Sequence, residues 1–203
     1  VISGGSGTVS SANAAIYASA SINEGTLTLG NGTNGGLASN YTLTGHAASS
    51  FQVTQRVLSS SGSRIYDGST TASSSDLTLS NLVGSETLTL SGNGTLGDAN
   101  VGTNKSVTLN TLSIADGTNG GLATNYNLTG GTHQLTITQR VLNATGTRLY
   151  DATSNADFSD LSLGNLVGSE TLVLSGTGTL ADNNVANNKT VGVGTLSLAN
   201  GSG

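Results

Sequence analysis

An internal repeat constrains this chain more than any other feature of its sequence. The segment RVLSSSGSRIYDG begins at Arg56, and the related segment RVLNATGTRLYDA begins at Arg140, 84 residues later and without a gap. A third, partial copy precedes them, because residues 26–45 match residues 111–130 at an offset of 85. A fixed period of this length is typical of a tandem array in which each module contacts its neighbours.

The alignment divides the chain into three parts. It predicts the C-terminal part of one repeat at 1–55, a complete repeat at 56–139 and the N-terminal part of a third repeat at 140–203. No Pro-rich or charged linker separates the copies, since the chain has no proline and only 8% charged residues. We therefore expect the modules to be tightly joined in a stiff rod, because beads on a flexible string require a linker.

Polar and apolar residues alternate along short segments that lie between clusters of Gly, Asn and Asp, as is typical of strands and turns. The alternating segments are 76–80, 86–90, 105–109 and 133–138. The pattern predicts an all-β chain of tandem immunoglobulin-like β-sandwich modules. The alternative is a right-handed β-helix, although its rungs of about 20–25 residues would give a shorter period than the one observed. A continuous strand over 136–142 would carry any strand exchange between modules.

The charge balance excludes several classes of function. Six Lys and Arg stand against 11 Asp and Glu, for a net charge of −5. The chain therefore lacks the basic patch that nucleic-acid binding requires. The same shortage of cations opposes docking on an anionic membrane, and the absence of a long apolar run predicts no membrane insertion in this fragment. There is no cysteine, so the chain forms no disulfide.

Residues 64–72, RIYDGSTTA, resemble the YDG-type repeats of large secreted bacterial adhesins of the filamentous-haemagglutinin kind. Residues 97–102 and 122–128 are similar to later strands of those repeats. The resemblance implies two-partner secretion, an extracellular or cell-surface location, and a stalk of many copies that serves attachment, aggregation or biofilm formation. The expected partners are neighbouring repeats of the same chain, with other copies in a filament or bundle and matrix polysaccharide as further candidates.

The chain offers no residue set suited to catalysis, and we expect that it is not an enzyme. Its two histidines, His46 and His133, do not align with each other and are predicted to be solvated at the surface. The predicted function is a structural stalk or fibre segment of an adhesin. The alternative is a multivalent module, in which each repeat binds polysaccharide or another surface ligand weakly and many copies add up.

Two groups of acidic residues are candidates for calcium binding. Asp116 opens the segment DGTNG, whose oxygen atoms and glycines suit a calcium loop. The aligned positions hold Asn31 and Asn200, and a calcium loop rarely loses its carboxylate, so we favour a structural turn. Asp98 and Asp182 form the second group, and we interpret them as caps that bind their own backbone. No cofactor is expected.

Two acid–lysine pairs recur together. Asp98 occurs with Lys105, Asp182 occurs with Lys189, and the first copy lacks both members. Shared presence and shared absence predict a contact in each repeat. The contact is expected to be a surface ion pair, with a Lys–Asp isopeptide bond as the alternative.

Four tyrosines recur at aligned positions, Tyr41 with Tyr126 and Tyr66 with Tyr150. In a β-sandwich a recurring tyrosine is usually a corner or core residue whose hydroxyl binds the backbone. We therefore predict a structural role for all four.

The tyrosine of the YDG motif opens a predicted turn that continues through Asp67 and Gly68, and the third repeat has Asp151 and Ala152 at these positions. Because Ala152 replaces Gly68, we interpret the glycine as convenient for the turn and not as strictly required by the backbone.

Overall fold

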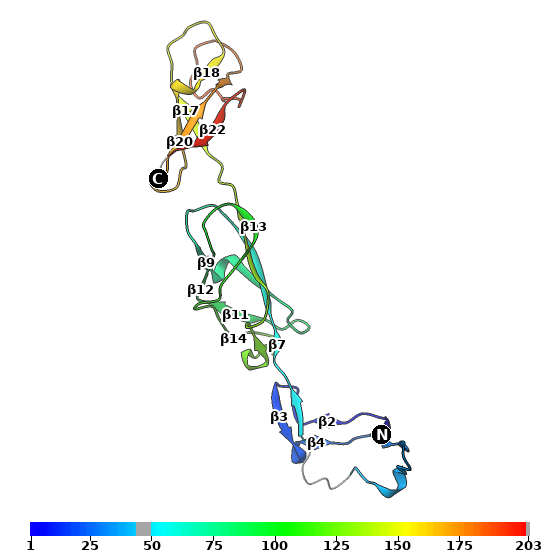
Figure 1. Ribbon diagram of the computed structural model, residues 1–203. Helices are drawn as coiled ribbons and strands as arrows, with labels where there is room; N and C mark the ends of the chain where they lie inside the picture. Colours follow the sequence, from blue (N-terminus) through cyan, green and yellow to red (C-terminus); the bar gives the residue numbers. More distant parts are fainter. Residues whose placement is uncertain (44–49, 202–203) are drawn as a thin grey trace. The chain divides into compact units, whose positions relative to one another are not determined.

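The structure is a computed structural model that describes residues 1–43 and 50–201, and within these residues the chain is all-β (Figure 1). Its regular elements are short strands and five single turns of 3-10 helix, so the all-β prediction is confirmed. In the part of the chain that is described, no helix is long and apolar enough to cross a membrane.

Each predicted repeat contains several short elements. The first part contributes β1 (Ile2–Gly4), β2 (Thr8–Val9), β3 (Ala15–Ala18), η1 (Ser19–Ser21), β4 (Ile22–Asn23), β5 (Thr28–Leu29), η2 (Ala38–Asn40) and β6 (Ser50–Val53). The complete repeat contributes β7 (Arg56–Val57), β8 (Ser59–Ile65), β9 (Thr71–Ser73), η3 (Ser74–Asp76), β10 (Leu77–Ser80), β11 (Leu88–Ser91), β12 (Asn93–Thr95), β13 (Gly102–Ser106), β14 (Ser113–Asp116), η4 (Ala123–Asn125), β15 (Tyr126–Asn127) and β16 (His133–Thr138). The third part contributes β17 (Asn143–Gly146), β18 (Asn155–Asp157), η5 (Phe158–Asp160), β19 (Leu161–Gly164), β20 (Leu172–Ser175), β21 (Thr177–Thr179) and β22 (Ser197–Asn200).

The same strand ladders recur in the second and third repeats. The antiparallel pair β8–β10 has Leu77 opposite Gly62, and the pair β17–β19 has Leu161 opposite Gly146. The pair β11–β14 returns as β20–β22, and the pair β9–β12 returns as β18–β21. Because every partner is displaced by 84 residues, the sequence period is also the period of the backbone hydrogen bonding.

The remaining pairs differ between the parts of the chain. In the complete repeat, four strands form a sheet in the order β10-β8-β16-β13, and β15 pairs in parallel with β7. In the first part, β3 pairs with β6, β1 with β5 and β2 with β4, all antiparallel.

The described chain divides into two compact units. The first consists of 1–62, 72–95 and 106–134, and the second consists of 63–71, 96–105 and 135–203. In the first unit Leu58 is the largest fully buried side chain, and in the second unit Leu135 and Ile137 are fully buried. The cores are small, as a chain with few large apolar residues requires.

Two strand predictions are wrong at their ends. The expected continuous strand over 136–142 is interrupted, because β16 ends at Thr138 and β17 begins only at Asn143. The expected strand over 105–109 also ends early, at Ser106, because the backbone then changes partners. The N–H of Val107 donates to the carbonyl of His133, whereas Thr108 pairs with Thr95.

The core assignment is tested by matched leucine substitutions. Leu58→Ala removes a fully buried side chain, and we expect a loss of about 2–5 kcal/mol in the free energy of unfolding. The control is Leu149→Ala, at a leucine that is 91% exposed, where the change is expected to stay within about 0.5 kcal/mol. Urea unfolding followed by circular dichroism measures both. Equal losses in the two variants contradict the assignment.

Candidate functional site

Each described repeat start is held by an arginine. The Arg56 guanidinium donates to the backbone carbonyl and to the side-chain oxygen of Asn81, both at 2.7 Å. Asn81 in turn donates from its amide to the carbonyl of Val57 at 2.7 Å. Arg140 and Asn165 repeat the first two bonds, also at 2.7 Å each. The planar guanidinium suits this two-pronged contact, so the arginine fixes the loop that follows β10 or β19 to the beginning of its repeat.

Both asparagines adopt a left-handed backbone conformation, with φ of 72° at Asn81 and 68° at Asn165. Asparagine tolerates this region better than most residues. The conformation turns the carbonyl and the side-chain oxygen of one residue toward the same guanidinium.

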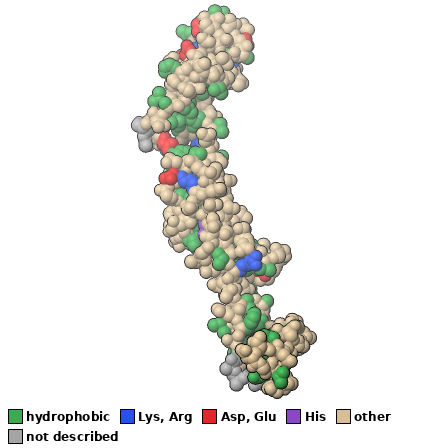
Figure 2. Space-filling view, turned by 45° about the vertical axis from the view of Figure 1, so that its right-hand side comes forward, with side chains coloured by type: hydrophobic (Ala, Val, Ile, Leu, Met, Phe, Trp, Pro, Cys, Tyr) green, Lys and Arg blue, Asp and Glu red, His purple; other side chains and the backbone are tan. Residues whose placement is uncertain are grey.

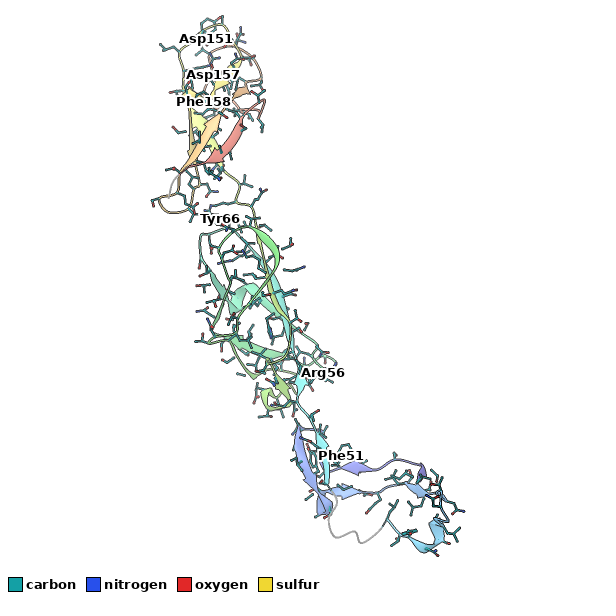
Figure 3. The ribbon with its side chains drawn as sticks, viewed as in Figure 1. Phe51, Arg56, Tyr66, Asp151, Asp157 and Phe158 are labelled. Atoms are coloured by element: carbon teal, nitrogen blue, oxygen red, sulfur yellow. The ribbon has the colours of Figure 1, made fainter. Side chains whose placement is uncertain are left out.

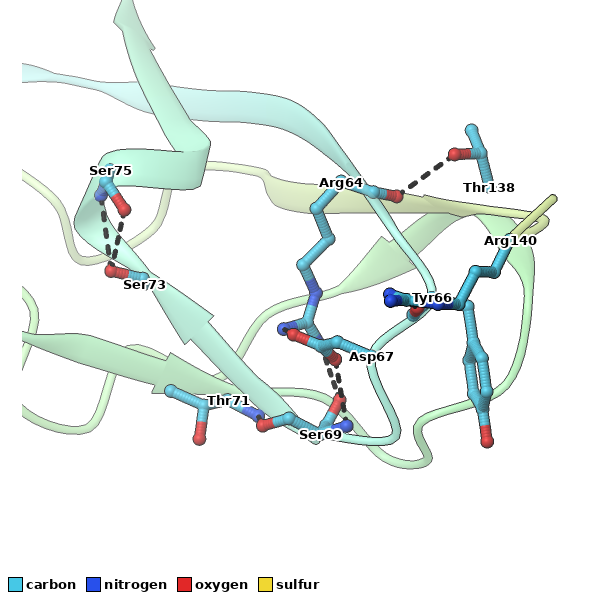
Figure 4. Close-up of polar contacts among 9 residues, drawn as sticks. All are labelled: Arg64, Tyr66, Asp67, Ser69, Thr71, Ser73, Ser75, Thr138 and Arg140. Carbon is cyan, nitrogen blue, oxygen red and sulfur yellow. Dashed lines mark hydrogen bonds and ion pairs between the residues drawn. The ribbon is translucent and has the colours of Figure 1, made fainter. Parts of the chain in front are cut away.

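The turn of the YDG motif contains a second arginine contact (Figure 4). Arg64 pairs with Asp67 at 2.7 Å and also donates to the carbonyl of Ser69. The Asp67 carboxylate accepts the N–H of Ser69 at 2.9 Å, which closes the turn. Thr138 binds the Arg64 carbonyl at 3.2 Å through its hydroxyl, so the turn is also fastened to the end of β16.

The third repeat builds the same turn, in which Figure 3 labels Asp151. Arg148 lies against the Asp151 carboxylate as an ion pair, although its Nη1 atom is not aligned for a hydrogen bond, and Nη2 donates to the carbonyl of Thr153 at 2.5 Å. The Asp151 carboxylate accepts the N–H of Thr153 at 2.9 Å. This backbone bond, together with Arg148, lowers the pKa of Asp151 to about 2.

Glycine itself is not strictly required at the position of Gly68, but a left-handed backbone is. Gly68 has φ of 75°, and Ala152 keeps the same left-handed backbone with φ of 63°. The turn therefore demands a positive φ in both repeats, and Ala152 meets the demand with steric strain that glycine avoids.

The structure brings together the two acid–lysine pairs predicted from the sequence. Lys105 donates to the Asp98 carboxylate and, at 2.8 Å, to the carbonyl of Asn100. Lys189 makes the corresponding bonds in the third repeat, with 2.5 Å to the carboxylate of Asp182. The Lys105 side chain is only 14% exposed. The lysine bond is the main cause of the lowered pKa of both Asp98 and Asp182.

The calcium candidate Asp116 is occupied by a bond within its own turn. Its side-chain oxygen accepts the N–H of Ala123 at 2.7 Å. At the aligned position, the amide oxygen of Asn31 accepts the N–H of Ala38 at 2.9 Å. Within 1–43 and 50–201, no group of three or more His, Asp or Glu residues is placed to hold a metal ion. An amide that performs the same task as the carboxylate favours a turn over a calcium site.

The surface prediction for His133 is wrong, and His46 lies outside the described residues. His133 is buried, with Nε2 2.9 Å from the Leu128 carbonyl and Nδ1 2.9 Å from the Ser60 hydroxyl. Because a carbonyl only accepts, Nε2 carries a proton, and a neutral imidazole then accepts the Ser60 hydroxyl at Nδ1. The alternation of β16 contained the signal, since His133 is in phase with the buried Leu135 and Ile137.

The four motif tyrosines behave differently. Tyr126 is 3% exposed, and its hydroxyl donates to the Glu86 carboxylate and accepts the N–H of Val83 at 3.1 Å. Tyr66, on the loop after β8 (Figure 3), donates to the carboxylate of Glu170 and not to the backbone. The core or corner prediction is wrong for the remaining pair in this structure, since Tyr41 is 70% and Tyr150 64% exposed.

The glutamates raise the pKa of both partnered tyrosines. For Tyr66 the hydrogen bond to Glu170 is the main cause, and for Tyr126 burial comes first, followed by the bond to Glu86. The neutral hydroxyl is the form that donates to a carboxylate, so both bonds are formed at neutral pH.

Within the described residues, every hydrogen bond that crosses a predicted repeat boundary involves a side chain. At the first boundary these bonds are Ala14 to Asn125, Asn125 to Asn13 and Gln55 to Thr124, at 2.8, 2.9 and 3.0 Å. At the second they are Tyr66 to Glu170, and Arg140 to the carbonyl of Tyr66 at 3.4 Å. Each set lies inside one compact unit. The repeats are thus joined by polar side chains and not by shared strands.

Comparison with known proteins identifies one family. A family model described as the YDG domain matches residues 52–134 and, in a second copy, residues 131–203. Among curated proteins and among solved structures, no match is found.

The strain at Ala152 is testable by substitution. Ala152→Gly is expected to raise the free energy of unfolding by about 1 kcal/mol, because glycine adopts the left-handed backbone without a steric cost. The control is Ala199→Gly in β22, which is expected to lower it by about 0.5–1 kcal/mol. Urea unfolding measures both variants. A loss of stability in Ala152→Gly contradicts the assignment of strain.

The lowered carboxylate pKa values predict acid destabilisation. A carboxylate whose folded pKa is depressed stabilises the fold above its unfolded pKa of 3.8, and that stabilisation is lost as the pH falls through the folded value, about 2 for Asp151. Asp151→Asn should therefore melt at a lower temperature than the parent at pH 6 but approach it near pH 2. Asp160→Asn serves as the control. Melting curves that stay parallel at every pH contradict the prediction.

Proposed function

The chain belongs to the YDG domain family, and from that premise we propose that it is a structural stalk or fibre segment of a large bacterial adhesin. The stalk is extracellular or attached to the cell surface after two-partner secretion. Its task is mechanical: it carries a binding region away from the cell and so supports attachment, aggregation or biofilm formation.

The observation that carries the proposal is the joint around Arg140. This arginine binds Asn165 in its own repeat and the carbonyl of Tyr66 in the preceding repeat, while Tyr66 binds Glu170. One cation and one tyrosine thus connect two consecutive repeats. Such a joint limits the freedom between modules, which a mechanical stalk requires and a set of independent binding domains does not.

The fold proposed for the stalk is a series of immunoglobulin-like β-sandwich modules, with boundaries at 1–55, 56–139 and 140–203. Recurring antiparallel ladders support this architecture over a β-helix, whose strands run parallel. The one parallel pair for which the register is described joins only the two-residue strands β15 and β7.

The surface supports a structural role. Most of the face drawn in Figure 2 consists of uncharged polar side chains and backbone, with isolated acidic and basic groups. We propose that the segment is not an enzyme and needs no cofactor, because all six of its basic side chains and most of its carboxylates bind within turns and joints. Its proposed partners are neighbouring repeats and other copies in a filament or bundle.

The experiment that tests the function has a binding arm and a location arm. The purified 203-residue chain is expected to retain no polysaccharide or matrix protein on an array, whereas antibodies against it label intact bacterial cells or their secreted fibres. In-frame removal of residues 56–139 from the full-length protein should reduce attachment of the cells that carry it. The same shortened protein, purified and in solution, should keep its affinity for the attachment surface. Reproducible binding by the isolated chain, lost in a scrambled control, would replace the stalk with the multivalent binding module.

A further inference from the structure

The two glutamates that bind tyrosines are presented by identical loops. Residues 82–86 and 166–170 share the sequence LVGSE and are called the LVGSE loops. In both loops the glutamate N–H donates to the valine carbonyl at 3.0 Å, and the central glycine has a left-handed backbone with φ of 55° or 54°. Because the loop backbone is the same, it presents Glu170 in the third repeat as it presents Glu86 in the complete repeat.

The two glutamates nevertheless bind tyrosines from different repeats. Glu86 accepts the hydroxyl of Tyr126, which belongs to the same repeat and opens β15. Glu170 accepts the hydroxyl of Tyr66, which belongs to the preceding repeat. Tyr126 also accepts the N–H of Val83, and the described contacts contain no corresponding bond from Val167 to Tyr66. The two tyrosines therefore reach the LVGSE loop in different ways.

The alignment explains why each glutamate shows only one tyrosine. The Tyr66-type partner of Glu86 and the Tyr126-type partner of Glu170 both fall at positions outside the sequence. A carboxylate has two oxygens and about four acceptor sites, so one glutamate accepts two hydroxyl groups without losing either bond. Hydrogen bonds to an ionised carboxylate are also stronger than those between neutral groups.

We propose that the glutamate of each LVGSE loop clamps two tyrosine hydroxyls at a joint, one from its own repeat and one from the YDG motif of the preceding repeat. The exposed surface formed by Tyr150 and Ala152, called the Tyr150 surface, is then the docking surface for the LVGSE loop of a following repeat. The proposal rests on the tandem-array part of the proposed function and is independent of the adhesin assignment.

The exposure of the tyrosines follows their partners. Tyr126 is buried beside Glu86, whereas Tyr41 and Tyr150, whose aligned glutamates fall outside the sequence, are largely exposed. Leu149 next to Tyr150 is the most exposed large apolar side chain of the described chain. In the complete repeat the aligned residues are Ile65 and Tyr66: Tyr66 is half-buried and bonded to Glu170, whereas Ile65 is still 59% exposed. A following module is therefore expected to cover Tyr150 and not Leu149.

Gly68 lies close to Val167 of the second LVGSE loop, and this contact shows how closely the loop approaches the YDG turn. A Cβ atom at Gly68 would lie 3.0 Å from Cγ1 of Val167 in the second LVGSE loop, closer than an ordinary contact. The glycine therefore permits the valine to approach as well as permitting the positive φ. Ala152 places a methyl group at the aligned position, so the Tyr150 surface should receive its loop less closely than the surface around Tyr66.

The proposal is tested by extending the full chain. A second copy of residues 120–203 appended after Gly203 continues the repeat in register, so it supplies an LVGSE loop to Tyr150 and a copied Tyr126 to Glu170. Nitration with tetranitromethane, followed by peptide mass mapping, is expected to modify Tyr41 and Tyr150 in the parent. In the extended chain Tyr41 remains reactive, whereas modification of Tyr150 falls about tenfold. Unchanged nitration of Tyr150 overturns the docking surface.

Hydrogen exchange tests the clamp itself. In the 203-residue chain, Tyr66→Phe should accelerate exchange over residues 166–170 about tenfold, because the lost bond is to a charged group. Tyr150→Phe is the matched control and leaves these residues unchanged. In the extended chain, Tyr150→Phe should instead accelerate exchange in the appended LVGSE loop.

A third comparison distinguishes whether Tyr66 and the copied Tyr126 share the Glu170 carboxylate or compete for it. In the extended chain, Tyr66→Phe and the replacement of the copied Tyr126 by Phe should each accelerate exchange over residues 166–170, and the double variant should exceed both. If either single variant leaves exchange unchanged, the two tyrosines are interchangeable and the two-tyrosine clamp is wrong. None of these outcomes depends on cell-surface location or on ligand binding, so the proposed function stands or falls separately.

Discussion

The bond network of one guanidinium organises each described repeat. Arg56 and Arg140 each bind two oxygens of a left-handed asparagine, and that asparagine begins the segment that leads into the LVGSE loop. The position of the loop determines where its glutamate meets a tyrosine. With only three large side chains fully buried among the described residues, packing alone leaves such loops weakly held, so directional polar bonds supply the order that a larger core supplies elsewhere.

Charged residues are scarce in this chain, so the contacts of each one indicate what the fold requires. The sequence contains 6 basic and 11 acidic side chains, and the structure places Arg64, Arg148, Lys105 and Lys189 in ion pairs with nearby acids. The lysine side chains are largely covered and also donate to backbone carbonyls. These pairs therefore help to hold turns in place. For this reason both members of a pair are present in a copy, or both are absent from it.

Local patterns and internal alignment predicted a definite part of this structure. Alternation located β16 at its observed ends, and shared presence and absence located the contact between Asp98 and Lys105. Neither route reaches Tyr66 and Glu170, which lie 104 residues apart and belong to different repeats. The left-handed backbone of Ala152 could not be predicted either, because alanine favours a negative φ and the surrounding turn overrides that preference. The interruption of the strand over 139–142 includes Arg140, whose bonds to Asn165 and Tyr66 no periodicity records.

The separation of backbone ladders from joints has a further consequence. In the described residues, no backbone-to-backbone hydrogen bond crosses the boundaries after Gln55 or Gln139. Side chains alone make the connection, and the residues that make it recur with the repeat. Gain or loss of a whole 84-residue copy through recombination therefore leaves every strand ladder closed and presents equivalent side chains to each other again. The length of such an array is free to vary between generations without any change in how its members fold.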